Sequence, residues 1–362
     1  MHHSFRYPLS LFILLLVASL LIVSCSDDDT MGPDIPPPGQ DGYFIVNEGG
    51  FGNGNTSLSY YDRTRDTVLN NVFESANGRK LGDQSQSMTV IGDQGYIVVQ
   101  NSSKIEVINR DDFTSVATIT DGIASPRYLA EVAENKAYVT DWGADGVTGT
   151  VKVVDLSSFQ VLQTIPVGQG PNEIVVINNR AYVANGGGFG RDSTVMVLDT
   201  QADAVVDTVV VGGNPSSLAV DANGALWVAG GGFIQYNEDF SAIIEEESTP
   251  GFLALVENDQ VSRTLEASQI NVGPSALVAT SNQLYLRYAG AVYSLSPEAT
   301  ELPEQPLIDQ RFYGLAVDPV SGEILGGEAP NFSSDGTFQR HTATGELIES
   351  YTVGIAPNGF AF

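Results

Sequence analysis

The chain contains 362 residues, and its 44 acidic against 16 basic side chains give a formal net charge of −28. A surface of this sign repels the phosphates of nucleic acids and anionic membranes, which argues against nucleic-acid binding. Carboxylates are also so frequent throughout the sequence that a pair of them carries no weight as a sign of glycoside hydrolysis.

The first segment resembles the signal sequence of a bacterial lipoprotein. Basic residues precede an apolar run at residues 9–23, which is short for a membrane span and is followed by Ser24 and Cys25. Cys25 is the only cysteine of the chain, so we expect residues 1–24 to be a signal peptide and Cys25 to be lipidated. An ordinary signal peptide is the alternative.

The next segment, residues 25–41, is expected to be a lipidated linker. It begins with Cys25 and the acidic letters SDDD, which resemble the surface-export tag of Bacteroidetes-type lipoproteins, and it continues with several prolines. A proline-rich spacer is extended and holds a following domain away from the lipid headgroups. These features predict a lipid-anchored protein of the outer membrane, exposed at the cell surface.

The remaining sequence contains an internal repeat. Residues 151–155 (VKVVD) and 161–168 (VLQTIPVG) align with residues 195–199 (VMVLD) and 205–212 (VVDTVVVG) at a fixed offset of 44 residues. A period of roughly 40 to 50 residues that carries short alternating strands is typical of a β-propeller blade. The repeat therefore predicts the fold before any single residue does.

In chain order, each repeat unit begins with a short turn and an apolar strand. These strands are expected to start at Ser85, Pro126, Pro171, Pro215, Pro274, Tyr313 and Pro357. The widest spacing, between Pro215 and Pro274, is assigned to the fifth unit with an insertion at roughly residues 237–268. A second strand with an aromatic residue follows, as at residues 43–46, 96–99, 137–140, 181–184, 226–229 and 284–286. The alternation is typical of half-buried strands, and no sustained helical period follows residue 25.

The two ends of the repeat indicate how the ring closes. The first unit begins at Tyr43 with its aromatic strand and lacks a preceding opening strand, whereas residues 354–362 have the pattern of an opening strand. We therefore predict an all-β, seven-bladed β-propeller over residues 42–362, in which the C-terminal strand completes the first blade. Closure of this kind removes exposed sheet edges.

Few residues beyond the linker could perform covalent or metal chemistry. His341 is the one histidine after Cys25, and a lipidated Cys25 leaves no free thiol, so neither a His/Cys zinc cluster nor a cysteine nucleophile is expected. His341 is predicted to lie in a strand and to be structural. Asp141 and Asp145 could bind Ca²⁺, but a solvated turn is favoured because the EF-hand pattern is incomplete. We expect no catalytic residue, no required cofactor and no metal site.

The loops between strands two and three emerge on the same face of a propeller as the loops that lead into strand one. Glycine-rich loops with one aromatic residue recur there, at residues 47–55 and 185–192. Aromatic rings supply contact area at low entropic cost, and Asn and Arg supply directional bonds. The alternative is that these rings pack against neighbouring blades. The candidate ligand-binding residues are Phe51, Asn53, Arg127, Tyr128, Trp142, Asn172, Asn185, Phe189, Arg287, Tyr288, Arg311, Tyr313 and Asn358.

Two motifs carry a resemblance to known families. Residues 138–141 (YVTD) and 182–185 (YVAN) resemble the YVTN/YncE-like propeller repeat. Residues 44–49 (FIVNEG), followed by GNGN and SLS, resemble the opening blade of surface lipoproteins that include the BtuG-type cobalamin-binding proteins. The resemblance implies that cobalamin or a related corrinoid is bound as a ligand and is passed to a TonB-dependent outer-membrane transporter.

Three functions stay open at this point. A binding protein that captures a corrinoid and performs no catalysis is favoured, and Phe51→Ala or Phe189→Ala is then expected to weaken binding by more than about 1 kcal/mol. A surface protein that binds or adheres to another protein is the second. A metal-dependent, lactonase-like enzyme is the third, and it would need a carboxylate cluster on the axis. The starts of the first strands instead carry Asn172, Asn214, Ser275 and Asn358.

Overall fold

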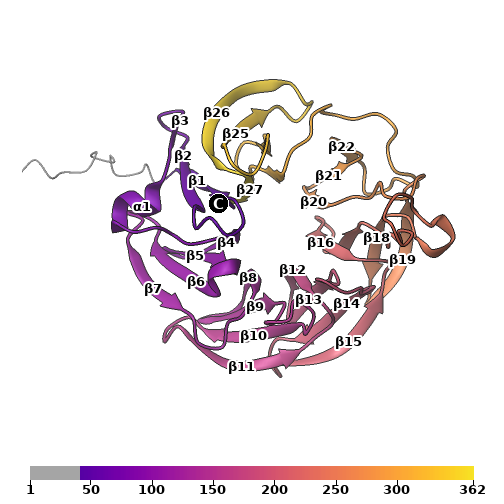
Figure 1. Ribbon diagram of the computed structural model, residues 1–362, viewed down its shortest axis with the longest axis horizontal. Coiled ribbons are helices and arrows are strands. Elements are labelled where there is room, and N and C mark those ends of the chain that lie inside the picture. The colour runs from indigo at the N-terminus through magenta and orange to yellow at the C-terminus, as the bar shows by residue number, and fades with distance from the viewer. Residues whose placement is uncertain (1–40) are drawn as a thin grey trace, which may run out of the picture. The chain divides into compact units, whose positions relative to one another are not determined.

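The repeated apolar strands form seven antiparallel sheets arranged in a ring (Figure 1). The structure is a computed structural model and describes residues 41–362, so the predicted signal peptide, Cys25 and nearly all of the linker lie outside the described residues. The prediction of an all-β, seven-bladed propeller is confirmed. Within the described part of the chain, no helix has the length and apolar character needed to span a membrane.

Blades one to four have four strands each, in order from the axis outward. Blade one contains β27 (Pro357–Ala361), β1 (Gly42–Asn47), β2 (Ser57–Asp62) and β3 (Thr67–Leu69). Blade two contains β4 (Ser85–Ile91), β5 (Gln94–Val99), β6 (Lys104–Asn109) and β7 (Ser115–Ile119). Blade three contains β8 (Pro126–Ala133), β9 (Lys136–Asp141), β10 (Thr150–Asp155) and β11 (Gln160–Pro166). Blade four contains β12 (Pro171–Ile177), β13 (Arg180–Asn185), β14 (Thr194–Asp199) and β15 (Ala204–Val210).

Blades five to seven complete the ring. Blade five contains β16 (Pro215–Val220), β17 (Leu226–Gly230), β18 (Phe252–Glu257) and β19 (Gln260–Glu266). Blade six has only three strands, β20 (Ala276–Ala279), β21 (Leu284–Tyr288) and β22 (Ala291–Leu295). Blade seven contains β23 (Gly314–Val317), β24 (Ile324–Glu328), β25 (Asp335–His341) and β26 (Leu347–Ile355). One short helix, α1 (Val72–Asn77), and two 3₁₀ turns, η1 (Gln100–Ser102) and η2 (Glu245–Glu247), lie between strands.

The C-terminal strand closes the ring, as the sequence predicted. β27 pairs antiparallel with β1, and Phe44, Ile45 and Val46 lie opposite Ala361, Phe360 and Gly359. The C-terminus consequently lies beside the first strand of the chain in Figure 1. The polar groups along this edge of β1 are thereby paired within the protein.

The first strand of each blade lies next to the axis and contacts the first strands of both neighbouring blades. Several of these strands contain a bulge just after their start, for example between Pro126 and Leu129 and between Pro171 and Ile174. A bulge inserts extra residues into one strand and re-aims their side chains. It accounts for the polar side chains that collect around the axis at these positions.

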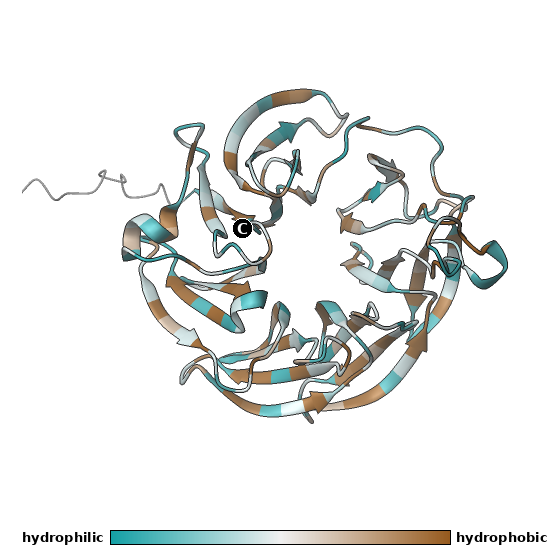
Figure 2. Cartoon of the chain, in the orientation of Figure 1, coloured by the Kyte–Doolittle hydropathy of each residue, from teal (hydrophilic) through white to brown (hydrophobic). Residues whose placement is uncertain are grey.

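The core consists of apolar layers between adjacent blades. One such layer joins Tyr96 and Val107 of blade two to Val139 and Val154 of blade three, all of them buried. Figure 2 shows that apolar positions recur along the strands around the whole ring. The repeated aspartate at the end of the third strand is explained by turn chemistry: a carboxylate oxygen of Asp155 accepts backbone N–H groups at Ser157 and Ser158, 3.0 and 2.7 Å away.

Three features differ from the sequence prediction. The insertion of blade five occupies residues 231–251, between β17 and β18, so the predicted range of 237–268 is wrong for its second half, which forms β18 and β19. Helix α1 was not predicted, because six residues are too few to show a helical period. Blade six also lacks a full fourth strand, because the segment after β22 pairs with it only through an isolated bridge between Val292 and Ile308.

Candidate functional site

A large groove crosses blade six on the face that carries the loops between strands two and three. Its volume is about 1400 Å³, and residues from blades five, six and seven line it. Sites for small molecules usually measure roughly 300–1,000 Å³, so this groove suits a large ligand. We call it the blade-six groove.

The blade-six groove exists because blade six has the shortest loop on this face. Only Ala289 and Gly290 join β21 to β22, whereas residues 231–251 and 329–334 form the corresponding loops of blades five and seven. Ala289 and Gly290 both have positive φ, 49° and 80°, which is the geometry of a tight type I′ hairpin turn. The longer loops of blades five and seven therefore form the two sides of a groove above blade six.

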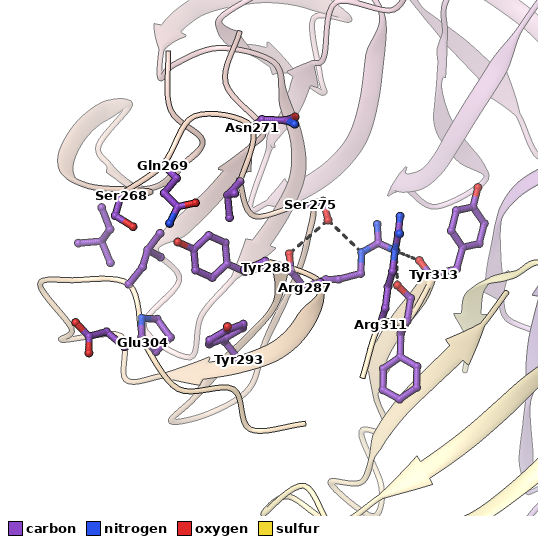
Figure 3. A pocket seen from close by; sticks show the side chains of 18 of the residues that line it. Ser268, Gln269, Asn271, Ser275, Arg287, Tyr288, Tyr293, Glu304, Arg311 and Tyr313 are labelled. Carbon is purple, nitrogen blue, oxygen red and sulfur yellow. Dashed lines mark hydrogen bonds between the residues drawn. The ribbon is translucent and has the colours of Figure 1, made fainter. Parts of the chain in front are cut away.

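The outer half of the groove combines aromatic rings with amide side chains. The rings of Tyr288 and Tyr293 lie 5.2 Å apart at an interplanar angle of 62°. Gln269 and Asn271 come from the segment that leads into blade six, and Glu304 comes from the segment that follows β22 (Figure 3). This half offers flat apolar area together with hydrogen-bond donors and acceptors.

The inner half of the groove, toward the axis, is cationic. Arg287 Nε donates to Ser275 Oγ at 3.1 Å, and its Nη1 donates to the carbonyl oxygens of Phe312, at 3.2 Å, and of Tyr313. Arg311 is exposed and extends beside Arg287 (Figure 3). Burial, and to a smaller extent the charge of Arg311, lower the pKa of Arg287.

A buried glutamate, Glu48, connects the groove to the axis. It accepts hydrogen bonds from the hydroxyl of Tyr313 in blade seven and from the amide groups of Gln84 and Gln86 in blade two, at 3.0 and 3.2 Å. Asn358 of β27 adds a longer contact of 3.4 Å. Burial, followed by the negative charge of Glu48, raises the pKa of Tyr313, so this phenol stays a hydrogen-bond donor.

Blade three contributes a half-buried arginine to the same region. The guanidinium of Arg127 lies 4.3 Å from the ring centroid of Trp142, and its Nη1 donates to Gln100 Oε1 at 2.5 Å. Its Nε is buried without a partner. Burial lowers the pKa of Arg127. Burial is also the largest cause of the raised pKa of Tyr128, the next residue in the chain.

Glu173 of blade four is the second carboxylate near the axis. Its Oε2 accepts hydrogen bonds from Ser217 Oγ at 2.9 Å and from the backbone N–H of Leu218 at 2.7 Å, both in blade five. Burial raises its pKa to about 7. In the described residues, no group of three or more His, Cys, Asp or Glu side chains is arranged to hold a metal ion.

The predicted candidate residues separate into three groups. Arg287, Tyr288, Arg311 and Tyr313 line the blade-six groove. Arg127, Tyr128, Asn172 and Asn358 lie near the starts of first strands, with Trp142 half-buried beneath Arg127. Phe51, Asn53 and Phe189 lie on exposed loops and do not line the groove. Asn185 is fully buried and donates to Thr194 Oγ1 at 2.9 Å, which is a structural contact.

Other residues have roles that the sequence did not reveal. Tyr293 and Gln269 line the groove, but they lie in β22 and in the segment that follows β19, where the repeat gave no signal for a site. Glu48 belongs to the opening FIVNEG motif, yet its contacts come from residues far along the chain. His341 is buried and bonded to Gly345 O and Gln339 Oε1, and both Asp141 and Asp145 accept N–H groups of their own turns.

The chain belongs to the family described as Domain of unknown function (DUF5074), whose model matches residues 41–353. The comparison with curated proteins finds no match. Among solved structures it is similar to a quinonprotein alcohol dehydrogenase-like protein of Bacteroides thetaiotaomicron, at 16% identity and a TM-score of 0.60, covering 89% of this chain and 78% of that one.

Two further structures have a similar fold. Hydrazine synthase of Kuenenia stuttgartiensis has 15% identity and a TM-score of 0.54, over 77% of this chain and 89% of that one. The computationally designed Ika8 protein has 14% identity and a TM-score of 0.55, over 87% and 95%. At these identities the likeness concerns the fold alone, because unrelated functions share propeller folds.

Proposed function

We propose that this protein is a cell-surface lipoprotein that binds a large cofactor-like ligand, cobalamin or a related corrinoid, in the blade-six groove and passes it to a TonB-dependent outer-membrane transporter. The proposed role is capture without catalysis. The observation that carries the proposal is the groove of about 1400 Å³, which combines tyrosine rings, amide side chains and arginines. A broad ligand with an apolar face and polar substituents fits such a lining.

The anchor is the second part of the proposal. Cys25 follows an apolar run and precedes an acidic, proline-rich linker, which is the arrangement of a lipidated surface protein. Cys25→Ser is expected to release the protein from the membrane fraction of its host. Association of this variant with membranes at the wild-type level would contradict the lipid anchor.

The ligand is tested by mixing the full-length protein in detergent with cyanocobalamin and separating the mixture by size exclusion. Co-elution of the visible cobalamin absorbance with the protein is expected. Clean separation at micromolar concentrations would remove cobalamin as the ligand. The transporter is tested by capture from solubilised outer membranes, with and without cyanocobalamin.

A second candidate is a surface protein that binds another protein. It is favoured by large apolar side chains at loop tips: Phe51, Phe189 and Phe240 are 73%, 81% and 77% exposed. Exposed aromatic residues are typical of contact surfaces between proteins. Capture of one outer-membrane protein without any ligand, lost in the combined Phe51→Ala and Phe189→Ala variant, would favour this function over corrinoid capture.

A further inference from the structure

We infer that the inner end of the blade-six groove is a binding site for an oxyanion, a phosphate or carboxylate group carried by the ligand, formed by Arg287 and Arg311. The inference rests on the proposed function insofar as the groove is taken as the ligand site. It adds the chemical class of the group that the ligand presents there. It also predicts which end of the ligand points toward the propeller axis.

Arg287 and Arg311 differ from the other basic residues in where they lie. Within residues 41–362, eight of the fifteen Lys and Arg side chains form an ion pair with a carboxylate: Arg63, Arg65, Arg79, Lys80, Lys104, Lys136, Arg180 and Arg340. Arg287 and Arg311 are among the seven that form no ion pair with a described carboxylate, and they are the two of those seven that line the groove, where they lie beside each other.

Arg287 is held rigidly. Its Nε and Nη1 are tied to Ser275 and to two backbone carbonyls, which fixes the plane of the guanidinium. Its Nη2 takes part in none of these bonds, and the Arg287 side chain lines the groove. A fixed guanidinium with a free edge loses little entropy when it binds an oxyanion.

The charges next to Arg287 and Arg311 leave room for an anion. Two guanidinium groups from different blades repel each other unless an anion lies between them. Two carboxylates lie near them, and neither forms an ion pair within the described residues. Glu173, whose charge acts on Arg287, accepts from Ser217 and Leu218. Glu328 lines the groove, and its Oε2 accepts from Gln310 at 3.2 Å and from Gln339 at 3.4 Å. Arginine binds phosphate and carboxylate groups through paired N–H donors, so an oxyanion satisfies both side chains.

The groove therefore has a direction. Its inner end has Arg287 and Arg311, whereas Glu304 and Gln269 lie at the other end (Figure 3). A ligand with one anionic group would place that group toward the propeller axis. Its neutral or hydrogen-bond-donating substituents would then lie toward blade five and the segment after β22.

The test uses inorganic phosphate as the probe and the full-length protein in detergent at low ionic strength. Phosphate binding is followed by ³¹P NMR line broadening, with chloride at matched ionic strength as the reference. The wild-type protein is expected to show saturable binding. Arg311→Gln, at an exposed position where folding is not at stake, is expected to weaken it at least ten-fold, and Arg311→Glu to abolish it.

The matched control is Arg110→Gln, which removes the same charge from an arginine outside the groove, in the turn between β6 and β7, that likewise forms no ion pair with any carboxylate of residues 41–362. It is expected to change phosphate binding less than two-fold. An equal loss in Arg110→Gln, no saturable binding by the wild type, or binding unaffected by Arg311→Gln would each overturn the inference.

The outcome is separate from that of the cobalamin experiment. Phosphate binding that depends on Arg311, combined with clean separation from cyanocobalamin, would keep the oxyanion site and reject cobalamin as the ligand. Co-elution with cyanocobalamin, combined with no phosphate binding, would reject the oxyanion site and keep the proposed ligand.

Discussion

The polar residues near the axis bond mainly to neighbouring blades. Glu173 of blade four accepts from Ser217 and Leu218 of blade five, and Glu48 of blade one accepts from residues of blades two and seven. Such bonds join adjacent blades near the axis, in addition to the apolar contacts between their strands. They also make the stability of the ring sensitive to the ionisation of single side chains.

Glu173 is expected to make the stability pH-dependent. Its pKa of about 7 lies above the ordinary value of 4.5, because burial disfavours the carboxylate. Between these two pH values the folded protein binds the proton more tightly than the unfolded chain does, so the free energy of unfolding contributed by this group decreases as the pH rises and levels off above pH 7. The total decrease is on the order of 3 kcal/mol.

Glu173→Gln keeps an acceptor for Ser217 and Leu218 but cannot ionise. Denaturant unfolding at pH 5 and pH 8 should show a smaller decrease of stability for this variant than for the wild type. Glu257→Gln, at an exposed position, serves as the control and should behave like the wild type. Identical pH dependence of the wild type and Glu173→Gln would contradict this account of Glu173.

Alanine variants of the exposed phenylalanines distinguish between two possible ligand sites, the blade-six groove and the loop tips. Because Phe51 and Phe189 are 73% and 81% exposed, truncation to alanine should change the free energy of unfolding by less than about 0.5 kcal/mol. A ligand in the blade-six groove touches neither, so both variants should also keep the wild-type affinity for cyanocobalamin in equilibrium dialysis. A loss of more than ten-fold would place the ligand at the loop tips, as the sequence motifs suggested.

At the scale of the strands, the sequence was informative wherever the repeat was regular. Proline marks the first residue of β8, β12, β16 and β27, because the missing N–H is tolerated at a strand start. The strands of blade five were harder to predict, because the insertion does not follow the repeat and therefore obscures where β18 and β19 begin. Asn185 is buried in the structure, and sequence cannot distinguish an amide at the base of a loop, which is buried, from one at its tip.

The turn between β21 and β22 is predicted to determine access to the groove. Replacing Ala289 and Gly290 by a flexible Gly/Ser loop of about eight residues should cover the hollow and weaken cyanocobalamin binding at least ten-fold, while the propeller still folds. The same replacement at the turn of Glu134 and Asn135, between β8 and β9 on the opposite face, is the control. Equal affinity of both loop variants would argue against the groove.

The closing strand is predicted to be essential for the fold. Deleting residues 357–362 removes β27 and leaves an edge of β1 unpaired next to the axis. The truncated protein should aggregate or lose its cooperative thermal transition. Deleting residues 238–241 from the exposed blade-five insertion should have little effect. A soluble monomer with unchanged thermal stability after loss of β27 would show that closure is dispensable.

For the whole molecule, the ring and its closure could be predicted from the sequence, whereas the groove could not. The groove depends on the difference in height between three adjacent loops and on the missing fourth strand of blade six, and neither is a property of any single motif. Arg287, Tyr288, Arg311 and Tyr313 were candidates because of their place in the repeat. Their convergence on one hollow follows from the packing of blades six and seven.

The central claim is that the blade-six groove holds the ligand, and a crystal structure of the protein with cyanocobalamin would test it most directly. We predict corrin density against Tyr288 and Tyr293, with an anionic group toward Arg311. Density at the tips of the loops that carry Phe51 and Phe189, or an empty groove at a millimolar concentration of cyanocobalamin, would contradict the claim.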